Sequence, residues 1–108
     1  MVGRLFRVIF SKKARTRLKE IGDYHKEHAS EEVRLKVRNK IIEEAEKLER
    51  NPERHTLLPG TEDLDYEVRY AKAWSYKIIF RIFSIKQIVR ILTISHDKQD
   101  PDKIIDDL

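Results

Sequence analysis

The stretch Tyr76-Lys77-Ile78-Ile79-Phe80-Arg81-Ile82-Phe83 decides the fold, because its pattern is that of a β-strand. Neighbouring side chains of a strand point to opposite faces, so the even-numbered residues share one face and the odd-numbered residues share the other. Bulky and β-branched side chains, which strands favour, stand on both faces. The sequence predicts a strand from Trp74 to Phe83 that is partly apolar on each side.

Two further segments have strand character and flank this one. Tyr66 to Tyr70 alternates aromatic or apolar residues with charged ones, and Gln87 to Ser95 follows after the break Ser84-Ile85-Lys86. Consecutive strands joined by short connections pair in antiparallel order. The second half of the chain is therefore predicted to form a three-stranded antiparallel meander.

Two amphipathic helices are predicted before the meander. After a strand from Leu5 to Phe10, Ser11 has the place of a helix N-cap, and apolar residues then recur every three or four positions as far as His28. Ser30 caps a second helix, which ends at Asn51-Pro52. The short link between the helices predicts an antiparallel hairpin. The apolar positions are Ala14, Leu18, Ile21 and Tyr24 in the first helix, and Val33, Val37, Ile41, Ala45 and Leu48 in the second.

A loop and a tail complete the chain. Glu53 to Asp63 carries Pro59-Gly60 and no periodicity, which is typical of an exposed loop. Asp100-Pro101 has the form of an N-cap followed by proline at the first helical position, so a short terminal helix is expected. The order βααβββ predicts an α+β fold in which the helical hairpin covers one face of a mostly antiparallel sheet. The other face is expected to be free for binding.

Composition limits both the size of the fold and its chemistry. The chain has 108 residues and no cysteine, which predicts a single domain over residues 1–108 and excludes disulfides and cysteine-based zinc or redox sites. No apolar run reaches the roughly 18 residues that a membrane span needs, so a cytoplasmic protein is expected. The 23 lysines and arginines outnumber the 19 acidic residues, although His96 to Leu108 holds two basic and five acidic residues. A basic body attracts polyanions or acidic proteins.

Four short patterns stand in order along the chain. They are Ser11-x-x-Ala14-x-x-x-Leu18-x-x-Ile21-x-x-Tyr24, then Asn51-Pro52, then Tyr76 to Ile82, then Ile91-Leu92-x-Ile94-x-His96. Together with the order of elements, and over nearly the whole chain, they resemble the RelE/ParE superfamily of toxins from type II toxin–antitoxin modules. The resemblance implies a small bacterial protein that arrests growth and stabilises plasmids. It also implies a cognate antitoxin, with an acidic and partly disordered segment, that holds the toxin inactive in a hetero-oligomer.

The superfamily contains two mechanisms, and the sequence leaves both open. RelE-like members cleave messenger RNA on the ribosome, whereas ParE-like members poison DNA gyrase, a binding function rather than an enzymatic one. The long helical hairpin favours ParE. By the resemblance, Arg69 and Lys77 stand where RelE-like nucleases place basic residues for the scissile phosphate, with lysine where arginine is commoner. The tail His96 to Pro101 lacks the further arginine and the tyrosine of those nucleases.

A nuclease needs particular chemistry at one phosphate. Cleavage at a 2′-hydroxyl requires a group that moves protons, and positive charge beside the phosphate. His96 is the natural proton shuttle, because histidine titrates near neutral pH. The candidate catalytic residues are therefore His96, Lys77, Arg81 and Arg69. In the alternative interpretation these residues are not catalytic. His96 is then a histidine packed at the end of a strand, and the three cations lie on a solvated face where they pair with Glu67 or with an antitoxin.

Three other features have weaker functional interpretations. His25 and His28 lie at i, i+3 but lack a third ligand, so an interaction with the C-terminus of the first helix explains them better than a metal. Trp74, Tyr70 and Tyr76 have the character of a base-stacking platform, but core or interface is the better interpretation. A basic stripe runs from Lys12 to Lys19 and is typical of a hydrated helix face.

A non-toxic alternative belongs to a different class of function. The chain has neither a Gly-rich phosphate loop nor a nucleophile elbow, and no cofactor and no metal is predicted. A basic nucleic-acid-binding or scaffold domain is compatible with the same composition. Such a domain predicts affinity for bare RNA or DNA that falls steeply with salt.

Overall fold

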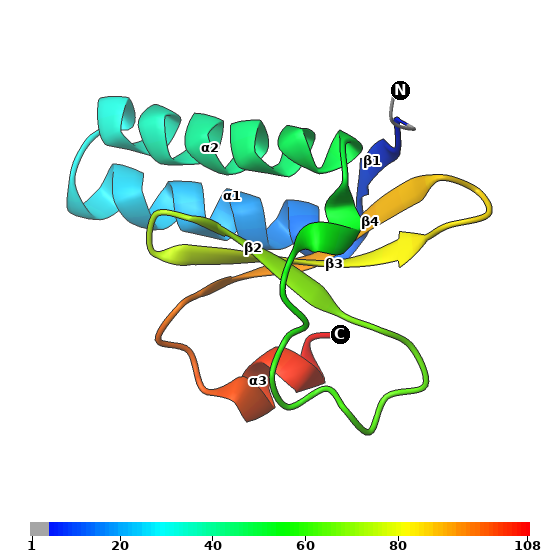
Figure 1. Cartoon of the computed structure of the whole chain (residues 1–108). Helices are drawn as coiled ribbons and strands as arrows, with labels where there is room; N and C mark the ends of the chain where they lie inside the picture. Colours follow the sequence, from blue (N-terminus) through cyan, green and yellow to red (C-terminus); the bar gives the residue numbers. More distant parts are fainter. Residues whose placement is uncertain (1–4) are drawn as a thin grey trace.

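A four-stranded sheet organises the computed structural model, which describes residues 5–108 (Figure 1). The strands lie in the order β1-β4-β3-β2, with β1 parallel to β4 and the other pairs antiparallel. The strands are β1 (Arg7–Phe10), β2 (Arg69–Ala73), β3 (Tyr76–Phe83) and β4 (Ile88–His96). The helices are α1 (Lys12–His28), α2 (Glu31–Glu46) and α3 (Pro101–Asp106), with short 3₁₀ turns at Lys47–Glu49 and Pro52–Arg54. The predicted α+β order is confirmed.

Serine caps begin both long helices, as predicted. The Ser11 hydroxyl accepts from the Ala14 N–H at 3.0 Å, and the Ser30 hydroxyl accepts from the Val33 N–H at 3.1 Å. The two helices then run side by side over one face of the sheet (Figure 1). Among the described residues, no helix is both long enough and apolar enough to cross a membrane.

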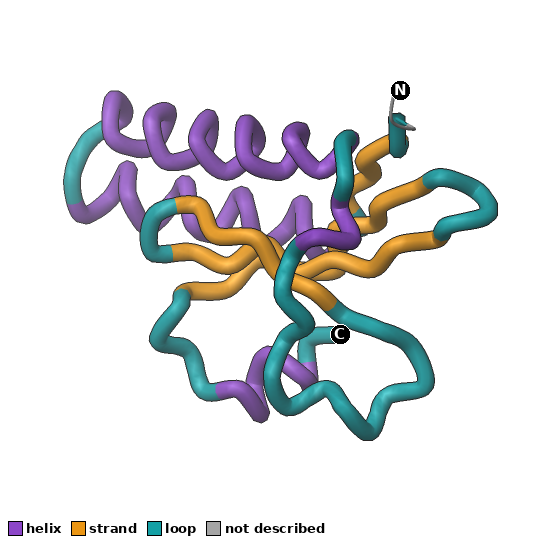
Figure 2. Tube along the Cα trace, viewed as in Figure 1, coloured by secondary structure: helices purple, strands orange, loops and turns teal. Residues whose placement is uncertain are grey.

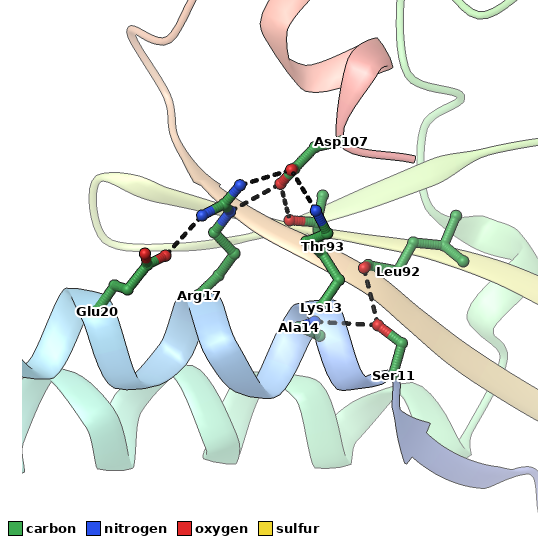
Figure 3. Close-up of polar contacts among 8 residues, drawn as sticks. All are labelled: Ser11, Lys13, Ala14, Arg17, Glu20, Leu92, Thr93 and Asp107. Carbon is green, nitrogen blue, oxygen red and sulfur yellow. Dashed lines mark hydrogen bonds and ion pairs between the residues drawn. The ribbon is translucent and has the colours of Figure 1, made fainter.

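A β-bulge ties the start of α1 to β4. Ile79 pairs with Thr93 while Phe80 pairs with Ile91, which leaves Leu92 as an extra residue of β4. The Leu92 carbonyl accepts a hydrogen bond from the Ser11 hydroxyl at 2.9 Å. The residue that caps α1 therefore also satisfies a backbone group at the bulge (Figure 3).

The larger hydrophobic core lies between the helical hairpin and the sheet. Ile78 and Phe80 of β3 are fully buried there, together with Ile41 of α2 and Leu48 of the following turn. Burial of this apolar surface is the main favourable term in folding. The other buried members are Ala14, Val37, Ala45, Ala71, Ala73, Val89, Ile91 and Ile94.

A second, smaller core covers the opposite face of the sheet. Ile79 is fully buried and packs with Leu58 and Val68, from the segment before β2, and with Ile104 of α3. The long loop and α3 lie together on this side of the sheet (Figure 2). The expectation that this face is free was wrong, because the apolar side chains of Ile79 and Leu92 on it require cover from water.

The strand β2 begins later than the alternation from Tyr66 to Tyr70 indicates. Its ladder with β3 runs from Arg69 to Ala73. Tyr66 packs in the second core, and the Val68 carbonyl accepts from the backbone N–H of Leu58 at 2.7 Å. The alternating residues before Arg69 therefore pair with the loop instead of with the sheet.

An ion-pair cluster around Asp107 fixes the C-terminal segment to α1 (Figure 3). Arg17 donates two hydrogen bonds to the carboxylate, at 2.8 and 2.6 Å, and Lys13 Nζ lies 3.3 Å from it. The Thr93 hydroxyl of β4 donates a further hydrogen bond at 2.7 Å. These bonds, those from Arg17 foremost, hold the pKa of Asp107 well below its usual range. One carboxylate therefore joins α1, β4 and the end of α3.

Phe80→Ala tests the larger core. The substitution removes a fully buried ring and is expected to lower the free energy of unfolding by about 3–5 kcal/mol. Leu35→Ala is the control, because the Leu35 side chain is exposed, and a change below about 1 kcal/mol is expected. Urea unfolding followed by circular dichroism measures both variants. Similar losses in the two variants would show that Phe80 does not anchor the core.

Asp107→Asn tests the ion-pair cluster. Because the folded-state pKa of Asp107 is depressed, its contribution to stability is present above the unfolded value of about 3.9 and is lost as pH falls through the folded-state pKa. The substitution is expected to lower the free energy of unfolding by about 2 kcal/mol at pH 7, and to weaken its dependence on pH below pH 4. Asp106→Asn, at an exposed neighbour, is the control. Thermal unfolding between pH 2 and pH 7 measures the difference, and identical pH curves for wild type and Asp107→Asn would contradict the assignment.

Candidate functional site

Positive charge gathers on the face of the sheet opposite the helical hairpin. Lys77 and Arg81 flank Ile79 at alternate positions of β3, so they point to the same side as the second core. Arg81 pairs directly with Arg90 of β4. We call Lys77, Arg81 and Arg90 the cationic face.

Aromatic rings support Arg81 and Lys77 of the cationic face. The Arg81 guanidinium lies 4.2 Å from the ring centroid of Tyr66 and 4.5 Å from that of Phe83. Lys77 Nζ lies 5.0 Å from the ring centroid of Tyr70. Within residues 5–108, none of the three cations forms an ion pair with a carboxylate. Like charges directly opposite each other on neighbouring strands repel, so an anionic partner would bind favourably here.

Arg69 points to the other side of the sheet. It pairs with Phe80, which lies in the larger core, so its side chain leaves β2 on the hairpin side. Its guanidinium donates to the His55 carbonyl at 2.6 Å and lies 3.5 Å from the Glu67 carboxylate. With its side chain only 18% exposed, Arg69 fixes the loop that precedes β2.

A small pocket nevertheless brings Arg69 and Arg81 together. It has a volume of about 260 Å³ and lies beyond the end of the β2–β3 ladder. Tyr66, Glu53 and Glu67 also line it. Because two carboxylates balance the two guanidinium groups, the charge of this pocket is close to neutral.

His96 lies on the hairpin side, at the far end of β4. It pairs with Tyr76, and the two ring centroids are 5.6 Å apart. Its Nδ1 accepts from the backbone N–H of Lys98 at 3.1 Å and lies 3.3 Å from the Asp97 carboxylate. Arg81 is five residues beyond Tyr76 along β3, which places it about 16 Å away, on the opposite face. The structure therefore does not bring His96 and Arg81 to one site.

The histidines of α1 make two different contacts. His25 Nε2 lies 2.8 Å from the Tyr76 hydroxyl, and burial raises the pKa of that tyrosine. His28 Nδ1 lies 3.0 Å from the Tyr24 carbonyl, and its ring stacks on that of Tyr24 with centroids 4.3 Å apart. Within the part of the chain that the structure describes, no three histidine or acidic side chains gather in a way that would hold a metal ion.

The aromatic residues named as a possible stacking platform do not form one surface. Tyr70 pairs with Ile79 in the second core, whereas Tyr76 packs against the larger core on the other face. Trp74 lies in the β2–β3 turn with φ of 52° and is 57% exposed. A bulky residue in the left-handed region is strained.

Arg90 is a member of the cationic face that residue types alone did not single out. Alternation along β4 places it on the same face as Ile88, which was visible in the sequence. Its position opposite Arg81 depends on the register between β3 and β4, which the bulge at Leu92 shifts. No local signal in the sequence marks that bulge.

Comparisons with known proteins agree with this fold. The family model described as ParE toxin of type II toxin-antitoxin system, parDE, matches residues 8–101. The solved structure of the chromosomal ParDE system from P. aeruginosa has a TM-score of 0.69 and 20% identity, covering 85% of this chain and 96% of that one. The RelBE2 toxin-antitoxin complex from Mycobacterium tuberculosis has a TM-score of 0.65 and 22% identity, covering 86% and 92%. The archaeal RelE-RelB complex from Pyrococcus horikoshii has a TM-score of 0.59 and 19% identity, covering 90% and 100%. No curated protein matches the chain.

Proposed function

We propose that this chain, which belongs to the ParE toxin family of type II toxin–antitoxin systems, arrests bacterial growth by binding DNA gyrase. The family match spans most of the chain, and gyrase poisoning is the action that the resemblance to ParE implies. The chain then works as a binding protein, with residues 1–108 forming one toxin domain in the cytoplasm.

The separation of His96 from the cationic face carries this proposal. RNA cleavage at a 2′-hydroxyl needs a proton shuttle and positive charge at the same phosphate. His96 lies on the hairpin side at the end of β4, while Lys77 and Arg81 point to the opposite face. Binding a large protein target needs no such convergence of groups.

We assign the cationic face to contact with an acidic surface of a partner. The rings of Tyr66 and Phe83 hold the Arg81 side chain in place, and the ring of Tyr70 holds that of Lys77. Side chains that are already ordered lose less conformational entropy on binding. In this assignment Arg81, Arg90 and Lys77 contact the partner, and Arg69 acts as a positioning residue for the loop.

We also propose that an acidic antitoxin neutralises the toxin in a hetero-oligomer. The structures from Mycobacterium tuberculosis and Pyrococcus horikoshii are toxin–antitoxin complexes of chains with this fold. The net charge of +4 suits an acidic partner by long-range attraction.

Ribosome-dependent cleavage of messenger RNA is the second candidate function. The pocket that Arg69 and Arg81 share motivates it, because guanidinium groups bind phosphate well, but a phosphate there would have to displace the carboxylates that also line the pocket. In that function Arg69, Lys77 and Arg81 supply positive charge and His96 moves the proton. The two functions make opposite predictions for His96.

Gyrase supercoiling measured with the purified chain tests the first function. Wild-type chain is expected to inhibit supercoiling of relaxed plasmid, because it binds the enzyme directly. The double variant Arg81→Glu/Arg90→Glu is expected to need about tenfold more protein for half-inhibition. Lys26→Glu/Lys36→Glu changes the net charge equally on exposed helix positions and is the control. Full supercoiling in the presence of a large molar excess of wild type would reject gyrase as the target.

His96→Ala separates binding from cleavage. The variant is expected to arrest growth as strongly as wild type, since no step of gyrase binding needs a proton shuttle. Growth after induced expression in bacteria, with circular dichroism to confirm that the variant folds, measures the effect. A folded His96→Ala chain that no longer arrests growth would favour the nuclease.

A further inference from the structure

The turn between β3 and β4 exposes an isoleucine that its geometry does not require. Residues 84–87 form this hairpin tip, which projects at the right of Figure 1. The Gln87 N–H donates to the Ser84 carbonyl at 3.3 Å, and Gln87 has a φ of 54°. Turns favour Gly, Asn, Asp and Ser, yet Ile85 is 100% exposed and Lys86 is exposed beside it. The hairpin tip therefore presents an apolar and cationic segment to solvent.

An apolar pocket with an acidic rim lies in the loop before β2. This loop pocket has a volume of about 520 Å³, and its lining includes Leu64 and Leu57, which is 46% exposed. Among the described residues, its charged lining consists of Glu62, Asp65 and Glu67, although the chain carries a net charge of +4. In the stretch from 5 to 108, neither Glu62 nor Asp65 forms an ion pair. Nucleic acid or an acidic peptide would be repelled here.

The hairpin tip and the loop pocket lie beside each other on the surface. The pocket shared by Arg69 and Arg81 is also lined by Ser84 of the hairpin tip, and by Tyr66 and Glu67, which belong to the loop pocket as well. The Arg81 guanidinium lies 4.2 Å from the ring centroid of Tyr66. One surface of the chain therefore carries both an exposed cationic segment and an acidic pocket, next to each other.

We propose that the loop pocket binds a second copy of this chain, with the hairpin tip of each copy seated in the loop pocket of the other. Ile85 would cover the leucines of the pocket, and Lys86 would pair with the carboxylates of Glu62 and Asp65. A two-fold axis generates such a reciprocal contact, and it is the commonest symmetry of protein oligomers. The axis would pass between the hairpin tip and the loop pocket, near Arg81.

The chemistry of the loop pocket selects this occupant. The pocket needs a partner segment that is both apolar and cationic, and the hairpin tip of the same chain has both properties. The contact would remove from water two apolar side chains, Ile85 and Leu57, that a single copy leaves exposed. Because the axis passes near Arg81, the dimer would keep Arg81 from a target. That consequence rests on the proposed function, whereas the contact itself does not.

Two complementary variants test the contact. The tip variant Ile85→Asp removes the apolar side chain and places a carboxylate against the acidic rim. The pocket variant Glu62→Lys/Asp65→Lys reverses the charge of that rim. Both positions of the pocket variant and Ile85 are exposed, so neither variant disturbs a core.

The controls make the matching changes on the helical hairpin. They are Leu35→Asp for the tip variant and Glu27→Lys/Glu46→Lys for the pocket variant, all at exposed positions. Sedimentation velocity at a fixed salt concentration measures the dissociation constant of the dimer. Native mass spectrometry separates mixed dimers from like ones, and circular dichroism confirms that each variant folds.

Wild type is expected to dimerise. The tip variant and the pocket variant are each expected to raise the dissociation constant of the dimer about tenfold or more, and the controls less than about twofold. A mixture of the two variants is expected to form mixed dimers. In the mixed dimer the unchanged hairpin tip of the pocket variant meets the unchanged loop pocket of the tip variant, and the introduced aspartate faces the introduced lysines.

Three outcomes would overturn the inference. They are a wild-type chain that stays monomeric at about 100 μM, a dimer that the test variants weaken no more than the controls do, and variants that do not associate when mixed. None of these measurements depends on growth arrest or on gyrase. A chain that dimerises in this way yet leaves gyrase active would reject the proposed function and retain this inference.

Discussion

Three consecutive residues of β3 are fully buried, and the rest of the molecule is arranged around that constraint. Ile78, Ile79 and Phe80 point alternately to the two faces of the sheet, so both faces must be covered. The helical hairpin covers one face, and α3 with the loop before β2 covers the other. The hydrogen bonds from Arg17 to Asp107 then attach the end of α3 to α1. If only one face of the sheet were covered, either Ile79 or both Ile78 and Phe80 would be exposed to water.

Because both faces of the sheet are covered, the possible positions of functional side chains are restricted. The centre of the sheet is closed on both sides, so charged side chains occupy its ends and rim. His96 emerges on the hairpin side at one end of β4, and the cationic face lies on the opposite side. The described residues thus present His96 and the cationic face on separate surfaces. Separate surfaces are compatible with the proposed binding of a target and of an antitoxin.

Local sequence patterns predicted the helices and strands, whereas contacts between residues far apart in the sequence determine the features that were not predicted. Ser11 and Ser30 were recognisable as caps, and the alternation of β3 was readable, because each depends on neighbours within a few residues. The bond between Arg17 and Asp107 joins residues 90 positions apart, so the closed second face could not be foreseen. The same holds for the candidate site. Which residue stands opposite Arg81, and which face Arg69 takes, follow from strand register and not from residue type.

We propose that this toxin acts by binding, because His96 and the side chains of the cationic face lie on opposite faces of the sheet. Sequencing of RNA 5′ ends from bacteria within minutes of induced expression tests that claim most directly. If the toxin acts by binding, growth arrest is expected with no new ends inside reading frames. New ends within translated codons, absent when His96→Ala is expressed, would contradict it.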